Sequence, residues 1–98
     1  MLMGVNYTLH KEKDYDRLYK LLRSTGTYSR VLESYWIIQT SESLDVWHQR
    51  VKSVTDSDDY FMLHDMTEAF ANHKVRGWLP NHVVEWIDSY IGIPAYVG

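Results

Sequence analysis

The stretch Thr27–Thr40, TYSRVLESYWIIQT, decides the fold of this 98-residue chain. It is rich in β-branched and aromatic residues, which favour strands. Its centre, Tyr35–Ile38, lacks a clean polar alternation, which is typical of a strand buried on both faces. Glu33-Ser34 is a candidate break, so the stretch is interpreted as two strands or as one bent strand. The segments on either side of it then determine the topology.

Helical patterns flank this stretch on both sides. Upstream, a helix is predicted over about residues 14–24, with Asp14 as its N-cap and Gly26 just beyond its end. Its apolar residues recur at helical spacing and are Tyr15, Leu18, Leu21 and Leu22. Downstream, a second helix begins after Ser41 or Ser43. One face of this helix carries Leu44, Trp47, Val51 and Val54.

A strand at each end completes the pattern. Leu2–Leu9 is predicted as the first strand, with alternate residues from Met3 to Leu9 on one face. After a polar turn over residues 55–59, Tyr60–Met66 is predicted as the last strand. Strand, helix, two strands, helix, strand is the split βαβ order of ferredoxin-like folds. The predicted fold class is therefore α+β, with a ferredoxin-like βαββαβ sheet.

The last third of the chain is predicted to add a C-terminal helix. Residues 67–77 show no clear pattern, whereas Pro80 or Asn81 suits the start of a helix. The apolar stripe of this helix comprises Val83, Val84, Ile87, Tyr90 and Ile91. Without a repeat or a linker, residues 1–98 are interpreted as a single domain, with a core over about 2–66 and an extension over about 67–98.

The composition predicts a covered second sheet face. Two helices on one face of a sheet leave the other face open, and small domains cover it by dimerising or with an extra helix. Aromatic residues make up 14% of the chain, with four Trp and eight Tyr. Because Trp and Tyr are favoured at interfaces, a homodimer is expected.

Several features predict a cytoplasmic protein. The chain has no Cys and therefore no disulfide. No apolar stretch reaches the roughly 20 residues that span a bilayer, so no membrane partner is expected. The start, MLMGVNYTLHKEKD, lacks the basic head and apolar run of a signal peptide.

The charge is unevenly distributed along the chain. The net charge of −3 argues against indiscriminate nucleic-acid binding. Residues 1–30 carry six basic and three acidic side chains, whereas residues 31–98 carry four basic and ten acidic ones. The basic first third is interpreted either as a surface that faces phosphates or as a solvated helix face with ordinary ion pairs. The acidic remainder fits a protein that competes with nucleic acid.

These elements and motifs resemble one protein family over about residues 3–90. The most telling pieces are Leu32–Trp36, LESYW, leading into IIQT, and Gly77–Pro80, GWLP. The chain resembles the small CRISPR-associated adaptation protein, the ferredoxin-like partner of the integrase. It is most similar to the relatives of that protein in bacteria and phages outside CRISPR loci.

The resemblance implies a homodimer that binds nucleic acid, and some family members are metal-dependent nucleases. Their catalytic group is an Asp at the end of the first strand, shared with the partner around a divalent ion. That position aligns with Thr8, in the stretch VNYTLH. A neutral hydroxyl brings no charge to hold Mg²⁺, so hydrolytic activity is expected to be lost. Mg²⁺ or Mn²⁺ is expected as a cofactor only for a nuclease.

Other residues are candidate replacements for that carboxylate. Asp65 is the second candidate catalytic residue, in a group with Thr8 and His10. The His residues show no metal-ligand spacing. Asp56, Asp58 and Asp59 are spaced like the start of a calcium loop, but the Gly and closing Glu of such a loop are missing. No metal site is therefore predicted.

Three functions follow from these observations. The first is a dimer without hydrolytic activity that binds nucleic acid or acts as a scaffold. The second is a small metal-dependent ribonuclease with a shifted site. The third is a protein-interaction module, such as a phage or mobile-element protein that inhibits a host or CRISPR-related complex. The predicted phosphate contacts to DNA or RNA are Lys11, Lys13, Arg17 and Arg30.

Overall fold

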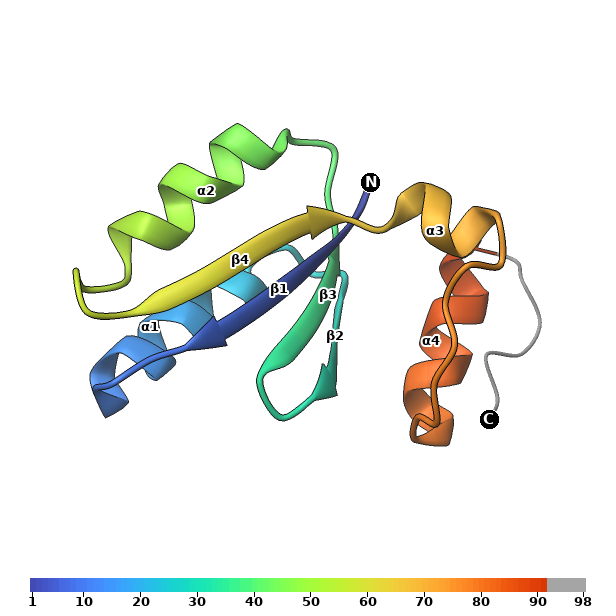
Figure 1. Cartoon of the computed structure of the whole chain (residues 1–98), viewed down its shortest axis with the longest axis horizontal. Coiled ribbons are helices and arrows are strands. Elements are labelled where there is room, and N and C mark those ends of the chain that lie inside the picture. The colour runs from blue at the N-terminus through green and yellow to red at the C-terminus, as the bar shows by residue number, and fades with distance from the viewer. Residues whose placement is uncertain (92–98) are drawn as a thin grey trace.

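A four-stranded antiparallel sheet forms the centre of the molecule, with the strand order β2-β3-β1-β4 (Figure 1). The computed structural model describes residues 1–91, with backbone alone for residues 90 and 91. The elements are β1 (Leu2–Thr8), α1 (Glu12–Arg23), β2 (Tyr28–Leu32), β3 (Tyr35–Gln39), α2 (Leu44–Ser53), β4 (Tyr60–Asp65), α3 (Thr67–Ala71) and α4 (Asn81–Ile91). The predicted α+β class is confirmed, and the sheet is compatible with the predicted ferredoxin-like arrangement.

The stretch Thr27–Thr40 forms two paired strands rather than one bent strand. β2 and β3 are antiparallel, and their register shifts between Arg30 and Leu32, just before the predicted break. The prediction that the centre of this stretch, Tyr35–Ile38, is buried on both faces is confirmed, because Ile37 and Ile38 are both buried and belong to different hydrophobic clusters. The sheet therefore has an apolar core on each side.

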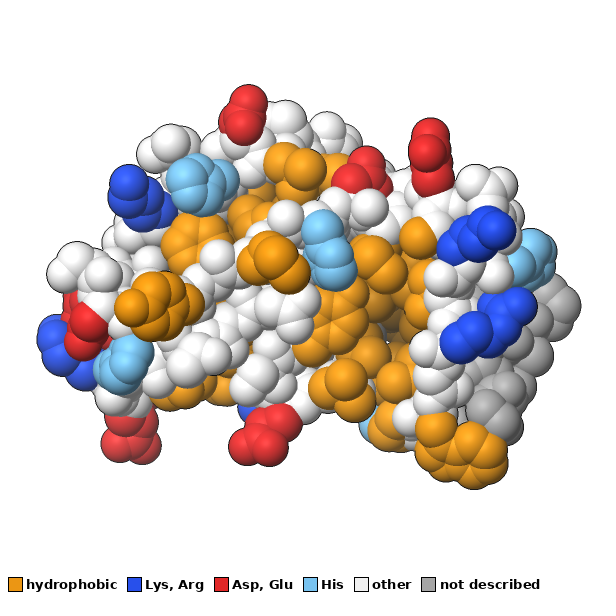
Figure 2. Space-filling view, viewed as in Figure 1, with side chains coloured by type: hydrophobic (Ala, Val, Ile, Leu, Met, Phe, Trp, Pro, Cys, Tyr) orange, Lys and Arg blue, Asp and Glu red, His pale blue; other side chains and the backbone are white. Residues whose placement is uncertain are grey.

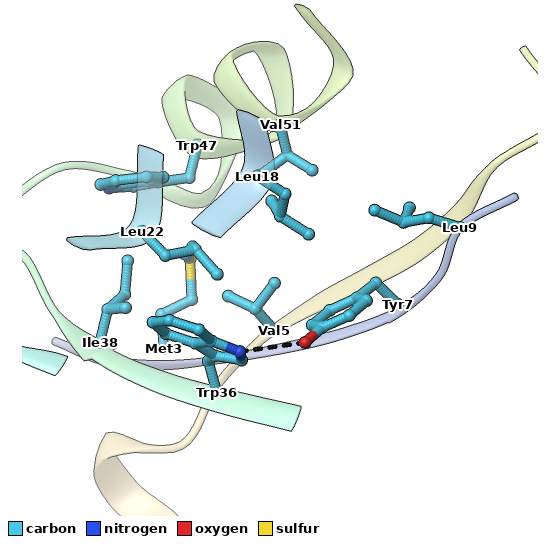
Figure 3. Close-up of a cluster of buried hydrophobic side chains, with 10 residues drawn as sticks. All are labelled: Met3, Val5, Tyr7, Leu9, Leu18, Leu22, Trp36, Ile38, Trp47 and Val51. Atoms are coloured by element: carbon cyan, nitrogen blue, oxygen red, sulfur yellow. Dashed lines mark hydrogen bonds between the residues drawn. The ribbon is translucent and has the colours of Figure 1, made fainter. Parts of the chain in front are cut away.

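The first core lies between the sheet and the helices α1 and α2 (Figure 3). Alternate residues of β1 point into it, because successive side chains of a strand face opposite ways. Its buried members are Met3, Val5, Tyr7, Leu9, Leu18, Leu22, Trp36, Ile38, Trp47 and Val51. Ser43 caps α2 as one of the two predicted alternatives, since its hydroxyl accepts a hydrogen bond from the Val46 N–H at 3.2 Å.

The start of α1 differs from the prediction. The helix begins at Glu12, and Lys11 occupies the N-cap position without a side-chain capping bond. Asp14 therefore lies inside the first turn, where its fully buried side chain accepts a hydrogen bond from Arg17. An Asp in the first turn still interacts favourably with the helix dipole, but burial of its side chain was not predicted.

The second core lies on the opposite face of the sheet, under α3 and α4 (Figure 1). Its buried members are Leu2, Val31, Ile37, Phe70, Val83 and Ile87. The predicted C-terminal helix is confirmed from Asn81, although the side chains of Tyr90 and Ile91 lie outside the described residues. The short helix α3 falls in the segment that showed no sequence pattern. No helix of the described residues is long and apolar enough to cross a membrane.

A buried hydrogen bond inside the first core fixes two aromatic side chains. The indole N–H of Trp36 donates to the Tyr7 hydroxyl at 3.0 Å (Figure 3). The same hydroxyl lies 3.2 Å from the Glu33 carbonyl, to which it donates. Burial, with the hydroxyl of Tyr19 nearby, raises the pKa of Tyr7 above its ordinary value. Tyr7 thus serves the core as both an apolar ring and an acceptor.

Replacement of Tyr7 by Phe is expected to lower the free energy of unfolding by about 1–3 kcal/mol, because the buried Trp36 N–H loses its acceptor. Urea denaturation followed by tryptophan fluorescence measures the change. The matched control is Tyr28→Phe, because that ring also contacts Trp36 but is 37% exposed. Equal losses in the two variants would contradict a specific role for the Tyr7 hydroxyl.

Candidate functional site

Part of the second sheet face remains uncovered, because α3 and α4 pack over only one end of it. We call this part the open face; it carries Asn6, Thr8, Tyr60, Met62 and His64. These residues alternate with core residues of β1 and β4, so their side chains point away from α1 and α2. Tyr60 is 70% exposed and Met62 is 60% exposed. Figure 2 shows hydrophobic side chains in the middle of this view and charged ones mostly toward its rim.

Thr8, which the resemblance aligns with a catalytic Asp, lies at the end of β1 opposite Tyr60 of β4. It is exposed and lines a groove of about 410 Å³. All residues that line this groove are uncharged: Asn6, Tyr7, Thr8, Ser34, Tyr60, Phe61 and Met62. A hydroxyl, an amide and a thioether suit contact with a neutral surface better than coordination of Mg²⁺, which prefers carboxylate oxygens.

Asp65, the second predicted catalytic residue, lies at the other end of the sheet. It pairs with Met3 across the β1–β4 ladder, whereas Thr8 pairs with Tyr60. The Asp65 carboxylate accepts a hydrogen bond from the Thr67 N–H at 2.9 Å, at the start of α3. The hydroxyl and N–H of Thr67 hold the pKa of Asp65 below its ordinary value. The structure does not bring Asp65 together with Thr8 and His10, and its contacts are those of a helix start.

A tyrosine–histidine pair lies on the second sheet face beside the open groove. The Tyr35 hydroxyl and His64 Nε2 are joined by a hydrogen bond of 3.0 Å. The two side chains come from β3 and β4 and meet across β1, above Gly4. A Cβ at Gly4 would lie 2.0 Å from His64 Nε2 and 2.5 Å from the Tyr35 hydroxyl. Burial raises the pKa of Tyr35.

Sequence reasoning missed this pair, since Tyr35 and His64 are far apart in the chain. The available signal was Gly4, a glycine inside a strand, which often marks a close approach by another group. Only the register of β1 with both neighbours shows which side chains make that approach.

Three of the four predicted phosphate contacts bind other parts of the chain. Lys11 Nζ lies 2.9 Å from the Asp56 carboxylate, and Arg17 donates to Asp14 at 2.6 Å. The Arg30 guanidinium donates to the Glu33 carbonyl and lies 5.0 Å from the Tyr19 ring centroid. Lys13, the fourth, is exposed in the first turn of α1. These partners support the interpretation of the basic segment as a face with ordinary ion pairs.

Acidic residues of the turn before β4 lie beside the end of β1. Asp59 accepts hydrogen bonds from the N–H groups of His10 and Asp56, both at 2.8 Å. Burial opposes ionisation of Asp59, but these donors outweigh it and lower the pKa to about 2. The side chain of Asp59 therefore ties the segment after β1 to the turn before β4.

The sequence alone suggests the start of a calcium loop for Asp56 and Asp59 and a helix cap for Asp14, and it does not predict that these residues meet. Their meeting follows from topology: the end of one antiparallel strand lies beside the start of its neighbour. The sequence places HKEKD after the first strand and TDSDD before the last, which was the available signal.

No family model, no curated protein and no solved structure matches this chain.

Substitution of Gly4 by Ala is expected to displace the His64 ring and to lower the free energy of unfolding by about 1–3 kcal/mol. In a His64→Ala background the same substitution is expected to cost less, with an interaction energy of at least about 0.5 kcal/mol. Denaturation of the single and double variants measures the cycle. Gly77→Ala is the control, since the nearest side-chain atom to its Cβ lies at 3.9 Å. Strict additivity would contradict the close approach of His64 to Gly4.

Proposed function

We propose that this chain is a scaffold protein that works as a homodimer, without hydrolytic activity, and is a ferredoxin-like relative of the CRISPR adaptation proteins. The observation that carries the proposal is the open face, with Tyr60 and Met62 exposed on a sheet. A second copy of the chain is the proposed occupant of this face. Full burial of a Met-sized side chain is worth roughly 1.5–3 kcal/mol, so these residues favour association.

The shape and charge of the open face support a second copy as the occupant. A two-fold contact uses the same patch on both subunits, so the patch needs protruding groups and a hollow to receive them. The open face has both, because Tyr60 and Met62 border the groove of about 410 Å³. The groove lining is uncharged, so two copies meet there without like-charge repulsion despite the net charge of −3.

The ion pairs of the basic segment favour a scaffold over nucleic-acid binding. A phosphate would have to displace Asp56 from Lys11, or Asp14 from Arg17, before either side chain became available. Proteins that bind nucleic acid through many phosphates instead present unpaired cations and bind more tightly at low salt. The proposed scaffold is therefore expected to cause weak or no retardation of RNA and DNA in a gel at low salt.

The charge-introducing variant Met62→Glu is expected to convert the dimer to a monomer, because it places two carboxylates in the neutral contact. Analytical ultracentrifugation over a range of concentrations measures the mass against the 11.6-kDa chain. Val46→Glu is the matched control, since Val46 is 40% exposed on α2, away from the open face. A monomeric wild type at every concentration would refute self-association and favour a protein-interaction module with a different partner.

Purified protein is expected to leave RNA and DNA intact in Mg²⁺ or Mn²⁺, because Thr8 supplies no carboxylate. Thr8→Asp, which restores the family residue, is expected to introduce metal-dependent cleavage if two copies bring this position together. Thr8→Ser is the control for a side chain of similar size without charge. Robust cleavage by the wild type that is lost in Thr8→Ala would overturn the non-hydrolytic assignment and favour the ribonuclease alternative.

A further inference from the structure

Three carboxylates converge between the first turn of α1 and the turn that precedes β4. We call Asp14, Asp56 and Asp59 the carboxylate cluster. One oxygen of each lies within 4.8 Å of the oxygens of the other two. The side chains of Asp14 and Asp59 are 0% exposed, and that of Asp56 is 30% exposed. The cluster is therefore a buried group of oxygen atoms with a partly open side at Asp56.

One buried oxygen atom in this cluster has no hydrogen-bond partner among the described residues. Asp14 Oδ1 accepts from Arg17, but Asp14 Oδ2 is buried without a donor. A buried acceptor left unsatisfied is costly, and an ionised one more so. Arg17 is the charged donor to the other oxygen of Asp14, at 2.6 Å. The unpartnered oxygen belongs to a carboxyl whose neighbours are other carboxyls.

The cations of the protein neutralise only part of the cluster. Lys11 binds Asp56 and Arg17 binds Asp14, which leaves one of three negative charges without a lysine or arginine partner. His10 Nδ1 lies 3.4 Å from Asp59, but its side chain is 48% exposed. The carboxylate of Asp59 accepts its hydrogen bonds mainly from two backbone N–H groups. A further positive charge is therefore favoured within the cluster, where Asp14 Oδ2 also lacks a hydrogen-bond donor.

We infer that the carboxylate cluster is a binding site for a hard divalent cation such as Mg²⁺, Mn²⁺ or Ca²⁺. These ions take oxygen ligands at about 2.0–2.6 Å, so two ligand oxygens of one ion are at most about 4–5 Å apart. The spacing in the cluster permits one ion to contact all three carboxylates. The exposed side of Asp56 leaves room for water, which Mg²⁺ in particular retains.

This site is separate from the proposed dimer contact and from the family metal position. Thr8 faces the groove, whereas the cluster uses α1 and the turn before β4. Cation binding would connect the first turn of α1 to this turn more firmly than the Asp59 hydrogen bonds alone. Loss of dimerisation and loss of cation binding are therefore distinguishable results.

Mn²⁺ binding to metal-stripped protein, measured by electron paramagnetic resonance, tests the site directly. One ion per chain is expected, and Mg²⁺ or Ca²⁺ in excess is expected to displace it. Thermal unfolding provides a second measurement, because an ion that binds only the folded chain raises the melting temperature as its concentration increases. An absence of Mn²⁺ binding at millimolar concentration would overturn the inference.

Paired variants locate the ion. Asp14→Asn is expected to weaken Mn²⁺ binding by at least about tenfold, because the number of charged ligands falls. Arg17→Gln is expected to strengthen it, because a competing cation is removed. Asp16→Asn, on the exposed side of the same helix, is the matched control and is expected to bind as the wild type does.

A shared proton is the competing way to satisfy Asp14 Oδ2. In that case Asp14→Asn, which resembles a protonated Asp, would leave the melting temperature unchanged or raise it, and divalent ions would not shift the melting temperature of the wild type. That combination would overturn the cation site. Equal Mn²⁺ affinities of Asp14→Asn and Asp16→Asn would also overturn it.

Discussion

The central position of β1, paired with β3 on one side and β4 on the other, is the constraint on which the rest of the structure depends. Because side chains alternate along a strand, β1 sends Met3, Val5 and Tyr7 into the core beneath α1 and α2. Its other residues face the second side of the sheet. Leu2 is buried there under α3 and α4, whereas Thr8 at the far end is exposed. The open face therefore lies where cover by the C-terminal helices ends.

The ends of the same strand explain where charge gathers. An antiparallel neighbour begins where β1 finishes, so the loop that enters α1 meets the turn that enters β4. Asp59 satisfies backbone donors from both segments. The basic residues that the sequence offers for phosphates, Lys11 and Arg17, balance the acids of this junction instead. One piece of topology thus pairs two candidate nucleic-acid contacts with acidic side chains and creates a candidate cation site.

The sequence predicted most elements because their signals are local. Ser is a preferred N-cap residue, so Ser43 indicates a helix start without knowledge of the tertiary structure. The apolar run at Ile37 and Ile38 indicates burial on both faces in the same local way. The remaining features depend on register. Neither the Tyr35–His64 pair over Gly4 nor the separation of Asp65 from Thr8 can be known before β1 is aligned with its neighbours. Asp14 is predicted as an N-cap because Asp is common at helix starts, but the helix begins two residues earlier, at Glu12.

The open face and the carboxylate cluster are structurally connected, although they serve different chemistry. Tyr60 borders the groove and directly follows Asp59, while Thr8 precedes His10 by two residues. The backbone atoms that Asp59 holds are therefore close in sequence to those that position the groove rim. A neutral contact surface needs a fixed shape more than it needs charge, because its affinity comes from burial and complementarity. The buried side chains of Asp14 and Asp59 keep their charge away from the surface on which a second copy is proposed to dock.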